Sequence, residues 1–259
     1  MRTLYYVAFY GLFMCLFYYC QPACATHDSG LIFDTQDFAP FSYKADGMVA
    51  GPGADIIRII CNEMKIKFTI RLTSWVRAQH NVKEGYAQAL FLLAKNPDRE
   101  TWLYFSHPIL DTEYGFFVRN DNTITITDIS QISGYRIGVY GPSNTSNILN
   151  TIKEKVNDIV IDLRPYDEAG FRKLCHGRDD AVFSNRDVGF MLINKLDLKN
   201  IRYAGAYQPV RYYIAFSKKN VDKSIVDTFN SIYLKLFQTK IIQGILNKYN
   251  LKPVDLESK

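Results

Sequence analysis

The chain has 259 residues, of which 47% are hydrophobic and 22% charged, a composition typical of a globular protein with a sizeable core. Its formal net charge of +5 is mild and no basic run concentrates it, which argues against nucleic acid as a partner. Beyond the first 25 residues only Cys61 and Cys175 remain, too few for a disulfide framework, and we expect both to be buried small hydrophobic residues. No Cys-x-x-Cys pair or Cys/His metal spacing occurs, so neither a metal nor another cofactor is expected.

The first 25 residues form a pattern typical of an export signal. Arg2 precedes an apolar and aromatic run from Leu4 to Tyr19, and Ala23-Cys24-Ala25 matches the small-x-small cleavage rule. An uncleaved anchor helix is the alternative, because the run approaches the lower limit of about 18 residues for a membrane span. A lipoprotein leader is a third interpretation. We predict a signal peptide over residues 1–25 and a mature chain that begins near Thr26, outside the cytoplasm.

After the leader, short apolar runs alternate with amphipathic ones, a pattern that predicts an α/β fold. In the first half we expect strands at 30–33, 67–72, 87–94 and 114–119, and helices at 55–64 and 75–83. In the second half we expect strands at 136–140, 159–163, 181–184 and 211–216, and helices at 146–155, 167–175 and 186–193. Two further helices, broken near Thr239, are predicted over residues 221–249.

Two βα series joined by two extended crossings predict a two-lobed fold. The crossings place hinges at 111–115 and 209–213. Lobe 1 would then be discontinuous, formed by residues 26–110 and 214–259, and lobe 2 would span 116–208. A single doubly wound domain is the alternative, which the paired crossings disfavour.

A series of short motifs lies between residues 40 and 108. In chain order they are Pro40-Phe41-Ser42-Tyr43, Gly47, Gly51-Pro52-Gly53-Ala54-Asp55, Ser74-Trp75-Val76-Arg77-Ala78, Asn96-Pro97-Asp98-Arg99 and Phe105-Ser106-His107-Pro108. Their joint order resembles the first lobe of the extracellular solute-binding proteins of family 3, the polar amino-acid receptors of bacterial ABC importers.

The resemblance implies a periplasmic-binding-protein-like fold of type II, with the two lobes closing on a small polar carboxylate, an amino acid or a related compound. It implies a periplasmic, monomeric protein that delivers this ligand to an ABC permease in the inner membrane and has no enzymatic activity.

Arg99 is the first candidate for the binding site. Pro97 starts a helix after a strand, which puts the arginine in a first turn, where a planar guanidinium can hold a carboxylate with two parallel hydrogen bonds. In the family the corresponding arginine grips the α-carboxylate of the ligand. The alternative is a surface arginine paired with Asp98 or Glu100.

Aromatic side chains are candidates for the walls of the pocket. By resemblance, Phe38 and Trp75 occupy positions where the family stacks on the ligand side chain, and aromatic faces suit this role. Core packing is the alternative, which we favour for Phe41. Arg77 offers a second cation if it faces the cleft, although a solvated helix face accounts for it equally well.

From lobe 2, the segment after residue 139 lies where the family has a loop that opens a helix and completes the carboxylate site. Its candidate residues are Tyr140, Ser143, Asn144 and Thr145. A plain helix N-cap without ligand contact is the alternative. Asn185 stands where the family has an aspartate that pairs with the α-ammonium of the ligand, and this neutral residue weakens the expectation of an ordinary α-amino acid.

Two other functions remain open. An enzyme on the same fold, such as a cyclohexadienyl dehydratase, needs a carboxylic acid in the cleft to protonate the leaving hydroxyl, and the positions assigned above provide none. A sensor domain coupled to a separate partner is the other.

Overall fold

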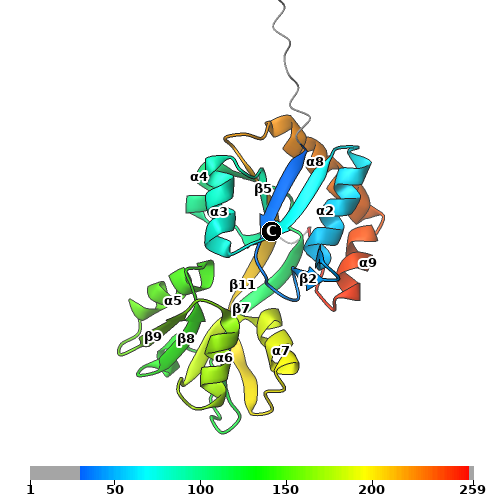
Figure 1. Cartoon of the computed structure of the whole chain (residues 1–259). Helices are drawn as coiled ribbons and strands as arrows, with labels where there is room; N and C mark the ends of the chain where they lie inside the picture. Colours follow the sequence, from blue (N-terminus) through cyan, green and yellow to red (C-terminus); the bar gives the residue numbers. More distant parts are fainter. Residues whose placement is uncertain (1–29, 257–259) are drawn as a thin grey trace, which may run out of the picture.

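A computed structural model describes residues 30–256, whose elements form two α/β lobes joined by two long strands (Figure 1). The predicted signal peptide and the predicted start of the mature chain lie outside the described residues. Within them, no helix has the length and apolar character needed to cross a membrane.

Lobe 1 is built on parallel strands covered by helices. Strand β1 (Leu31–Thr35) lies between β4 (Phe68–Leu72) and β5 (Ala89–Ala94) and pairs in parallel with both. The other elements are the hairpin β2 (Tyr43–Ala45) and β3 (Met48–Ala50), β6 (Leu103–Phe105), α2 (Pro52–Glu63), α3 (Trp75–Glu84), α4 (Pro97–Trp102), α8 (Lys223–Gln238) and α9 (Ile241–Lys248). The C-terminal helices α8 and α9 pack against α2, which brings both ends of the described chain into one lobe (Figure 1).

Lobe 2 has the same arrangement of parallel strands and helices. Strand β8 (Arg136–Tyr140) pairs in parallel with β9 (Val160–Arg164) and with β10 (Ala181–Asn185). Its helices are α5 (Asn144–Lys153), α6 (Asp167–Cys175), α7 (Arg186–Lys195) and the short 3-10 helix η2 (Ile129–Ile132).

The two crossing strands are β7 (Leu110–Arg119) and β11 (Ile201–Ser217), which pair with each other in antiparallel register. Strand β11 also pairs with β5 of lobe 1, whereas β7 pairs with β10 of lobe 2, so one continuous sheet runs through both lobes. The predicted hinges lie opposite each other within this pair, for example Glu113 facing Pro209. Their exact limits, and the lobe limits derived from them, stay predictions.

Most of the predicted elements are found within two or three residues of their expected limits, and the strand at 136–140 and the helix at 167–175 match fully. One strand is much longer than predicted, because β11 begins at Ile201 rather than at 211. The hairpin β2–β3 and strand β6 were not predicted. Each of these strands has three residues, too few to show an alternating pattern.

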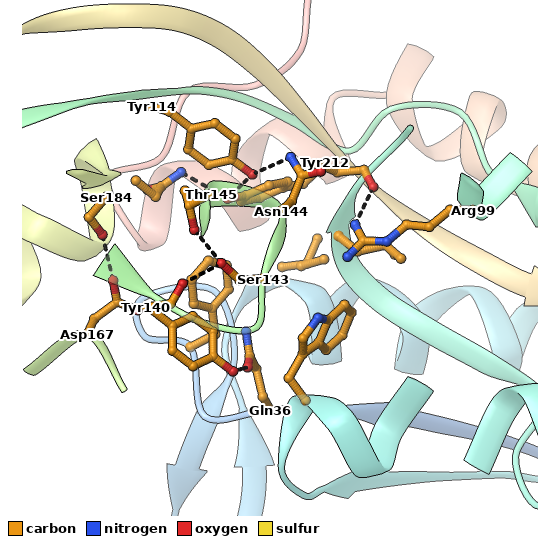
Figure 2. A pocket seen from close by; sticks show the side chains of 16 residues that line it. Gln36, Arg99, Tyr114, Tyr140, Ser143, Asn144, Thr145, Asp167, Ser184 and Tyr212 are labelled. Carbon is orange, nitrogen blue, oxygen red and sulfur yellow. Dashed lines mark hydrogen bonds between the residues drawn. The ribbon is translucent and has the colours of Figure 1, made fainter. Parts of the chain in front are cut away.

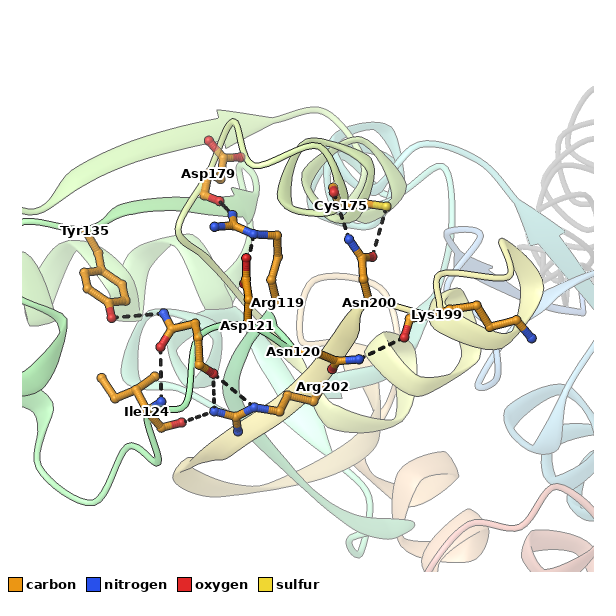
Figure 3. Close-up of polar contacts among 11 residues, drawn as sticks. Arg119, Asn120, Asp121, Ile124, Tyr135, Cys175, Asp179, Lys199, Asn200 and Arg202 are labelled. Atoms are coloured by element: carbon orange, nitrogen blue, oxygen red, sulfur yellow. Dashed lines mark hydrogen bonds and ion pairs between the residues drawn. The ribbon is translucent and has the colours of Figure 1, made fainter.

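The two cysteines behave differently. Cys61 is fully buried on the core face of α2, and burial raises the pKa of its thiol to about 12, so the prediction of a small buried hydrophobic residue is confirmed. For Cys175 it is wrong, because this residue is half-buried and its thiol donates a hydrogen bond to Asn200 Oδ1 at 3.2 Å (Figure 3). Nearby in the same view, the Arg202 guanidinium donates to backbone carbonyls of Asn122 and Ile124 and so ties strand β11 to the segment after β7.

Candidate functional site

A pocket with about 430 Å³ of space, partly open to solvent, lies between the two lobes (Figure 2). Lobe 1 contributes Gln36, Phe38, Trp75, Leu92, Leu93, Ala94 and Arg99, lobe 2 contributes Tyr140, Ser143, Asn144, Thr145, Asp167, Ser184 and Asn185, and the crossing strands contribute Tyr114 and Tyr212. The pocket is concave and lined by both apolar and polar side chains, as ligand pockets in proteins commonly are.

Arg99 is a buried cation on the lobe 1 side of this pocket. The side chain of Asn96 caps α4 by accepting from the Arg99 backbone N–H at 2.9 Å, which fixes the first turn that carries the arginine. The residue is 6% exposed, its Nη1 donates to the Ala94 carbonyl at 2.6 Å, and its guanidinium lies 5.3 Å from the ring centroid of Trp75. Burial lowers the pKa of Arg99.

Within residues 30–256, no carboxylate forms an ion pair with Arg99. The alternative of a surface arginine paired with its neighbours does not hold, since Arg99 is buried and Glu100 pairs with Lys95 at 2.7 Å. A buried charge normally has a charged partner, and this guanidinium lacks one within the described residues.

Two of the predicted aromatic walls line the pocket. Trp75 starts α3 and is 5% exposed, while Phe38 is half-buried and packs against Phe41 and Tyr212, with ring centroids 5.1 and 5.9 Å away. Phe41 is fully buried in the core, as predicted. Arg77 does not line the pocket. Two residues turn a helix by about 200°, so Arg77 points away from the side of α3 that buries Trp75 and is exposed to solvent.

The loop from lobe 2 both caps a helix and lines the pocket. Ser143 is the N-cap of α5, and its hydroxyl accepts from the Ser146 N–H at 3.1 Å. Thr145 Oγ1 lies 2.7 Å from the same hydroxyl. The capping role that was the alternative is therefore present, and in the same loop both residues reach the pocket wall.

Two hydrogen bonds cross the cleft beside the pocket. Tyr140 donates its hydroxyl to Gln36 Oε1 at 2.7 Å, and Asn96 Nδ2 donates to Asn144 Oδ1 at 3.0 Å. Each bond joins one residue of lobe 1 to one of lobe 2, so the structure has its lobes in direct contact around the pocket. Figure 2 shows the bond between Tyr140 and Gln36.

Asn185 lines the pocket, but its side chain is fully engaged by the protein. Its Oδ1 accepts from the backbone N–H groups of Asp187 and Val188 at 2.9 and 3.2 Å, which caps α7. Its Nδ2 donates to Thr112 Oγ1 at 3.0 Å and to the Tyr212 hydroxyl at 3.1 Å. A carboxamide has two acceptor sites and two donor hydrogens, and all four are used.

Asp167 is the carboxylate that the sequence did not single out. It is the first residue of α6 and lies half-buried at the pocket wall, where its Oδ1 accepts from the Ser184 hydroxyl at 2.7 Å. Loss of water contact raises the pKa of this carboxyl to about 6. The sequence did contain a signal for this position. Asp167 follows β9, Tyr140 ends β8 and Asn185 ends β10. Because the carboxyl ends of parallel strands lie at one edge of a sheet, these three residues are expected near one another.

Tyr114 and Tyr212, also missed, bring the two crossing strands into the site. The Tyr212 hydroxyl donates to the Tyr114 hydroxyl at 3.4 Å, and Asn144 Nδ2 donates to the same oxygen at 3.5 Å. Burial raises the pKa of both phenols. No acceptor for the hydrogen of the Tyr114 hydroxyl is found within residues 30–256.

A wider cleft of about 960 Å³, open to solvent, adjoins the pocket. Five residues line both spaces and so mark their boundary, namely Gln36, Phe38, Trp75, Tyr140 and Asp167. The wider cleft adds the charged residues Asp37, Glu168 and Lys195. Arg99 does not line it.

Solved structures of other proteins resemble this chain in fold, at low sequence identity. No curated protein sequence matches the chain. A solved histidine kinase sensor domain with similarity to periplasmic binding proteins superposes with a TM-score of 0.77 at 20% identity, covering 87% of this chain and 98% of that one. The substrate-binding protein of an amino acid ABC transporter gives 0.71 at 18% identity, covering 85% and 98%.

An ancestral amino-acid-binding protein, described as a precursor of cyclohexadienyl dehydratase, gives a TM-score of 0.73 at 17% identity, covering 85% of this chain and 94% of that one. At these identities the likeness concerns the fold, which is the predicted periplasmic-binding-protein-like one. The model of the bacterial extracellular solute-binding proteins, family 3, matches residues 32–252. Because this match spans both lobes and most of the chain, the protein belongs to the family 3 extracellular solute-binding proteins.

Proposed function

We propose that this protein captures a small carboxylate between its lobes and delivers it to an ABC importer. The observation that carries the proposal is Arg99, a guanidinium buried at the pocket wall without a carboxylate partner in the described chain. A ligand carboxylate would restore the missing charge and accept two parallel hydrogen bonds from the planar fork.

The neighbouring groups support an anion at this position. The free hydrogen of the Tyr114 hydroxyl adds a neutral donor, and the Trp75 ring under the guanidinium excludes water from one face. A desolvated site strengthens each of these interactions relative to water. Phe38, Leu92 and Leu93 line the remaining wall with apolar surface for the body of the ligand.

Closure of the lobes accompanies binding in this proposal. The ligand enters while the lobes are apart, contacts both, and is enclosed when the bonds Tyr140–Gln36 and Asn96–Asn144 form across the cleft. The bending sites are the predicted hinges at 111–115 and 209–213, in the crossing strands. The remaining parts of the proposal are a monomer in the periplasm and an ABC permease in the inner membrane as partner. The family and the transporter protein of similar fold support the location and the kind of partner.

The closure prediction is tested by small-angle X-ray scattering. We expect the radius of gyration of the purified protein to fall when a bound carboxylate is added at saturation, because two rigid lobes move together about the crossings. Mass spectrometry of small molecules that co-purify with the protein identifies the ligand to add. Scattering curves that superpose with and without a ligand whose binding calorimetry has demonstrated would contradict hinge closure.

A second prediction concerns the hydrogen bond from Tyr140 to Gln36. Tyr140→Phe removes this interlobe bond and keeps the ring, so we expect ligand affinity to fall by roughly two- to tenfold, the value of one hydrogen bond of about 0.5–1.5 kcal/mol. Tyr166→Phe is the matched control, because Tyr166 is 61% exposed and lines only the wider cleft. Equal affinities of the two variants, measured by calorimetry, would show that the bond does not contribute to closure.

Asp167 is the residue that a dehydratase activity, the enzymatic alternative, would require. Most of a half-buried carboxyl with a pKa of about 6 is ionised at pH 7, but it is protonated more often than an ordinary aspartate, and a general acid in a dehydratase needs a shift in this direction. Release of product from a cyclohexadienyl substrate by the wild type, absent in Asp167→Asn, would replace the binding function by an enzymatic one. We propose that the protein is not an enzyme and expect no turnover.

A further inference from the structure

The pocket carries one positive and one negative group, at different ends. Among the residues that line it, Asp167 is the only carboxylic acid and Arg99 the only base. The two side chains lie on opposite sides of the pocket (Figure 2), Arg99 from lobe 1 and Asp167 from lobe 2. Asp167 also lines the wider cleft, which Arg99 does not reach, so the negative group lies toward the cleft and the positive group at the inner end.

The usual position for an ammonium in this family cannot serve here. Asn185 uses both acceptor sites of its oxygen on the backbone of α7 and both amide hydrogens on Thr112 and Tyr212. An ammonium offers only donors, so it would have to break the cap of α7 to reach this oxygen. Asp167, in contrast, accepts a single side-chain hydrogen bond, from Ser184, and has lone pairs left on both oxygens.

The end of the pocket where Asp167 lies is also lined by aromatic rings. Phe38, Trp75 and Tyr140 line both the pocket and the wider cleft, which places them at the boundary where Asp167 also lies. Aromatic faces suit a chain of methylene groups, which contributes only apolar surface. Along the pocket, the cation therefore lies at the inner end, and the anion lies beside aromatic rings at the boundary with the wider cleft.

We infer that the ligand is an ω-amino carboxylate, a zwitterion with its carboxylate on Arg99, its ammonium on Asp167 and a methylene chain between them. In an α-amino acid both charged groups are attached to one carbon atom, so such a ligand spans less of the pocket than its ω-isomer does. This inference deepens the proposed function and depends on it, since it assumes that Arg99 binds the carboxylate.

The test compares pairs of isomers that differ only in the position of the ammonium. Calorimetry measures binding of 4-aminobutanoate against 2-aminobutanoate, 5-aminopentanoate against 2-aminopentanoate, and 6-aminohexanoate against 2-aminohexanoate. We expect at least one ω-isomer to bind the wild type roughly tenfold or more tightly than its α-isomer, because only the ω-isomer gains the charge-assisted bond to Asp167.

Two variants assign this preference to a residue. Asp167→Asn removes the charge and keeps an oxygen that can accept from Ser184, and we expect it to reduce the isomer ratio to about one. Glu168→Gln is the matched control, since Glu168 is the next residue and lines only the wider cleft, where it pairs with Arg172 at 2.8 Å. We expect this control to keep the wild-type ratio. Thermal unfolding verifies that both variants fold, and the wild-type ratio is informative without them.

The outcomes separate this inference from the proposed function. Equal or tighter binding of every α-isomer, or an ω-preference that survives in Asp167→Asn, overturns the inference and leaves a carboxylate receptor that depends on Arg99. Binding of none of these compounds, nor of the corresponding unsubstituted carboxylates butanoate, pentanoate and hexanoate, overturns the proposed function and the inference together.

Discussion

Replacing Arg99 with alanine is expected to lower the affinity for carboxylate ligands by roughly thirtyfold or more, equivalent to about 2–5 kcal/mol. The variant loses both hydrogen bonds of the fork and the charge that opposes the ligand anion in a desolvated pocket. Calorimetry with the co-purified ligand, or with a carboxylate shown to bind the wild type, measures the loss.

The fold should survive this substitution. Arg99 makes one side-chain hydrogen bond, to the Ala94 carbonyl, and its charge has no ion-pair partner in the described chain, so its removal also relieves a desolvation penalty. We expect the free energy of unfolding to change by no more than about 1–2 kcal/mol.

Arg77→Ala is the matched control, because it removes the same side chain from an exposed position of α3 outside the pocket. It should bind like the wild type. An Arg99→Ala variant that is folded and retains wild-type affinity would exclude Arg99 from the binding site.

Replacing Asn185 with aspartate is expected to lower the free energy of unfolding at neutral pH by about 1–3 kcal/mol without improving the binding of α-amino acids. Aspartate can still cap α7, but it cannot donate to Thr112 and Tyr212, and it places a charge at a position that is only 2% exposed. Urea unfolding of the ligand-free protein measures the change.

Asn157→Asp is the control for this substitution, since it adds the same charge at an exposed position between α5 and β9. We expect it to change stability by less than about 0.5 kcal/mol. An Asn185→Asp variant that is as stable as the wild type and binds α-amino acids more tightly would show that position 185 can receive an ammonium.

Local sequence patterns were sufficient to predict the helices and strands that contain at least one full period of the hydrophobic pattern. Helix α6 and strand β8 were predicted without error, because an amphipathic pattern of nine residues and a five-residue strand with a buried centre are long enough to be recognised. The first ten residues of β11 were missed. They pair with β7 more than eighty residues earlier in the chain, and this pairing rather than a local pattern extends the strand.

The candidate binding residues Arg99 and Arg77 were also predicted from local motifs. Arg99 could be predicted because its helix start, capped by Asn96, is encoded within four consecutive residues. Arg77 was a weaker candidate from the same kind of motif, and the rotation of α3 directs it to solvent. The burial of Arg99 and the exposure of Arg77 both follow from helices of lobe 1.

The sequence by itself therefore determined the family, the α/β architecture and the arginine that defines one end of the pocket, since each depends on residues close together in the chain. Only the tertiary structure decided that Asn185 is engaged by Thr112 and Tyr212, and that Asp167 faces the pocket. These contacts join β10 and α6 to the crossing strands and to the cleft. The physical reason is that the availability of a polar group depends on which distant groups already use its donors and acceptors.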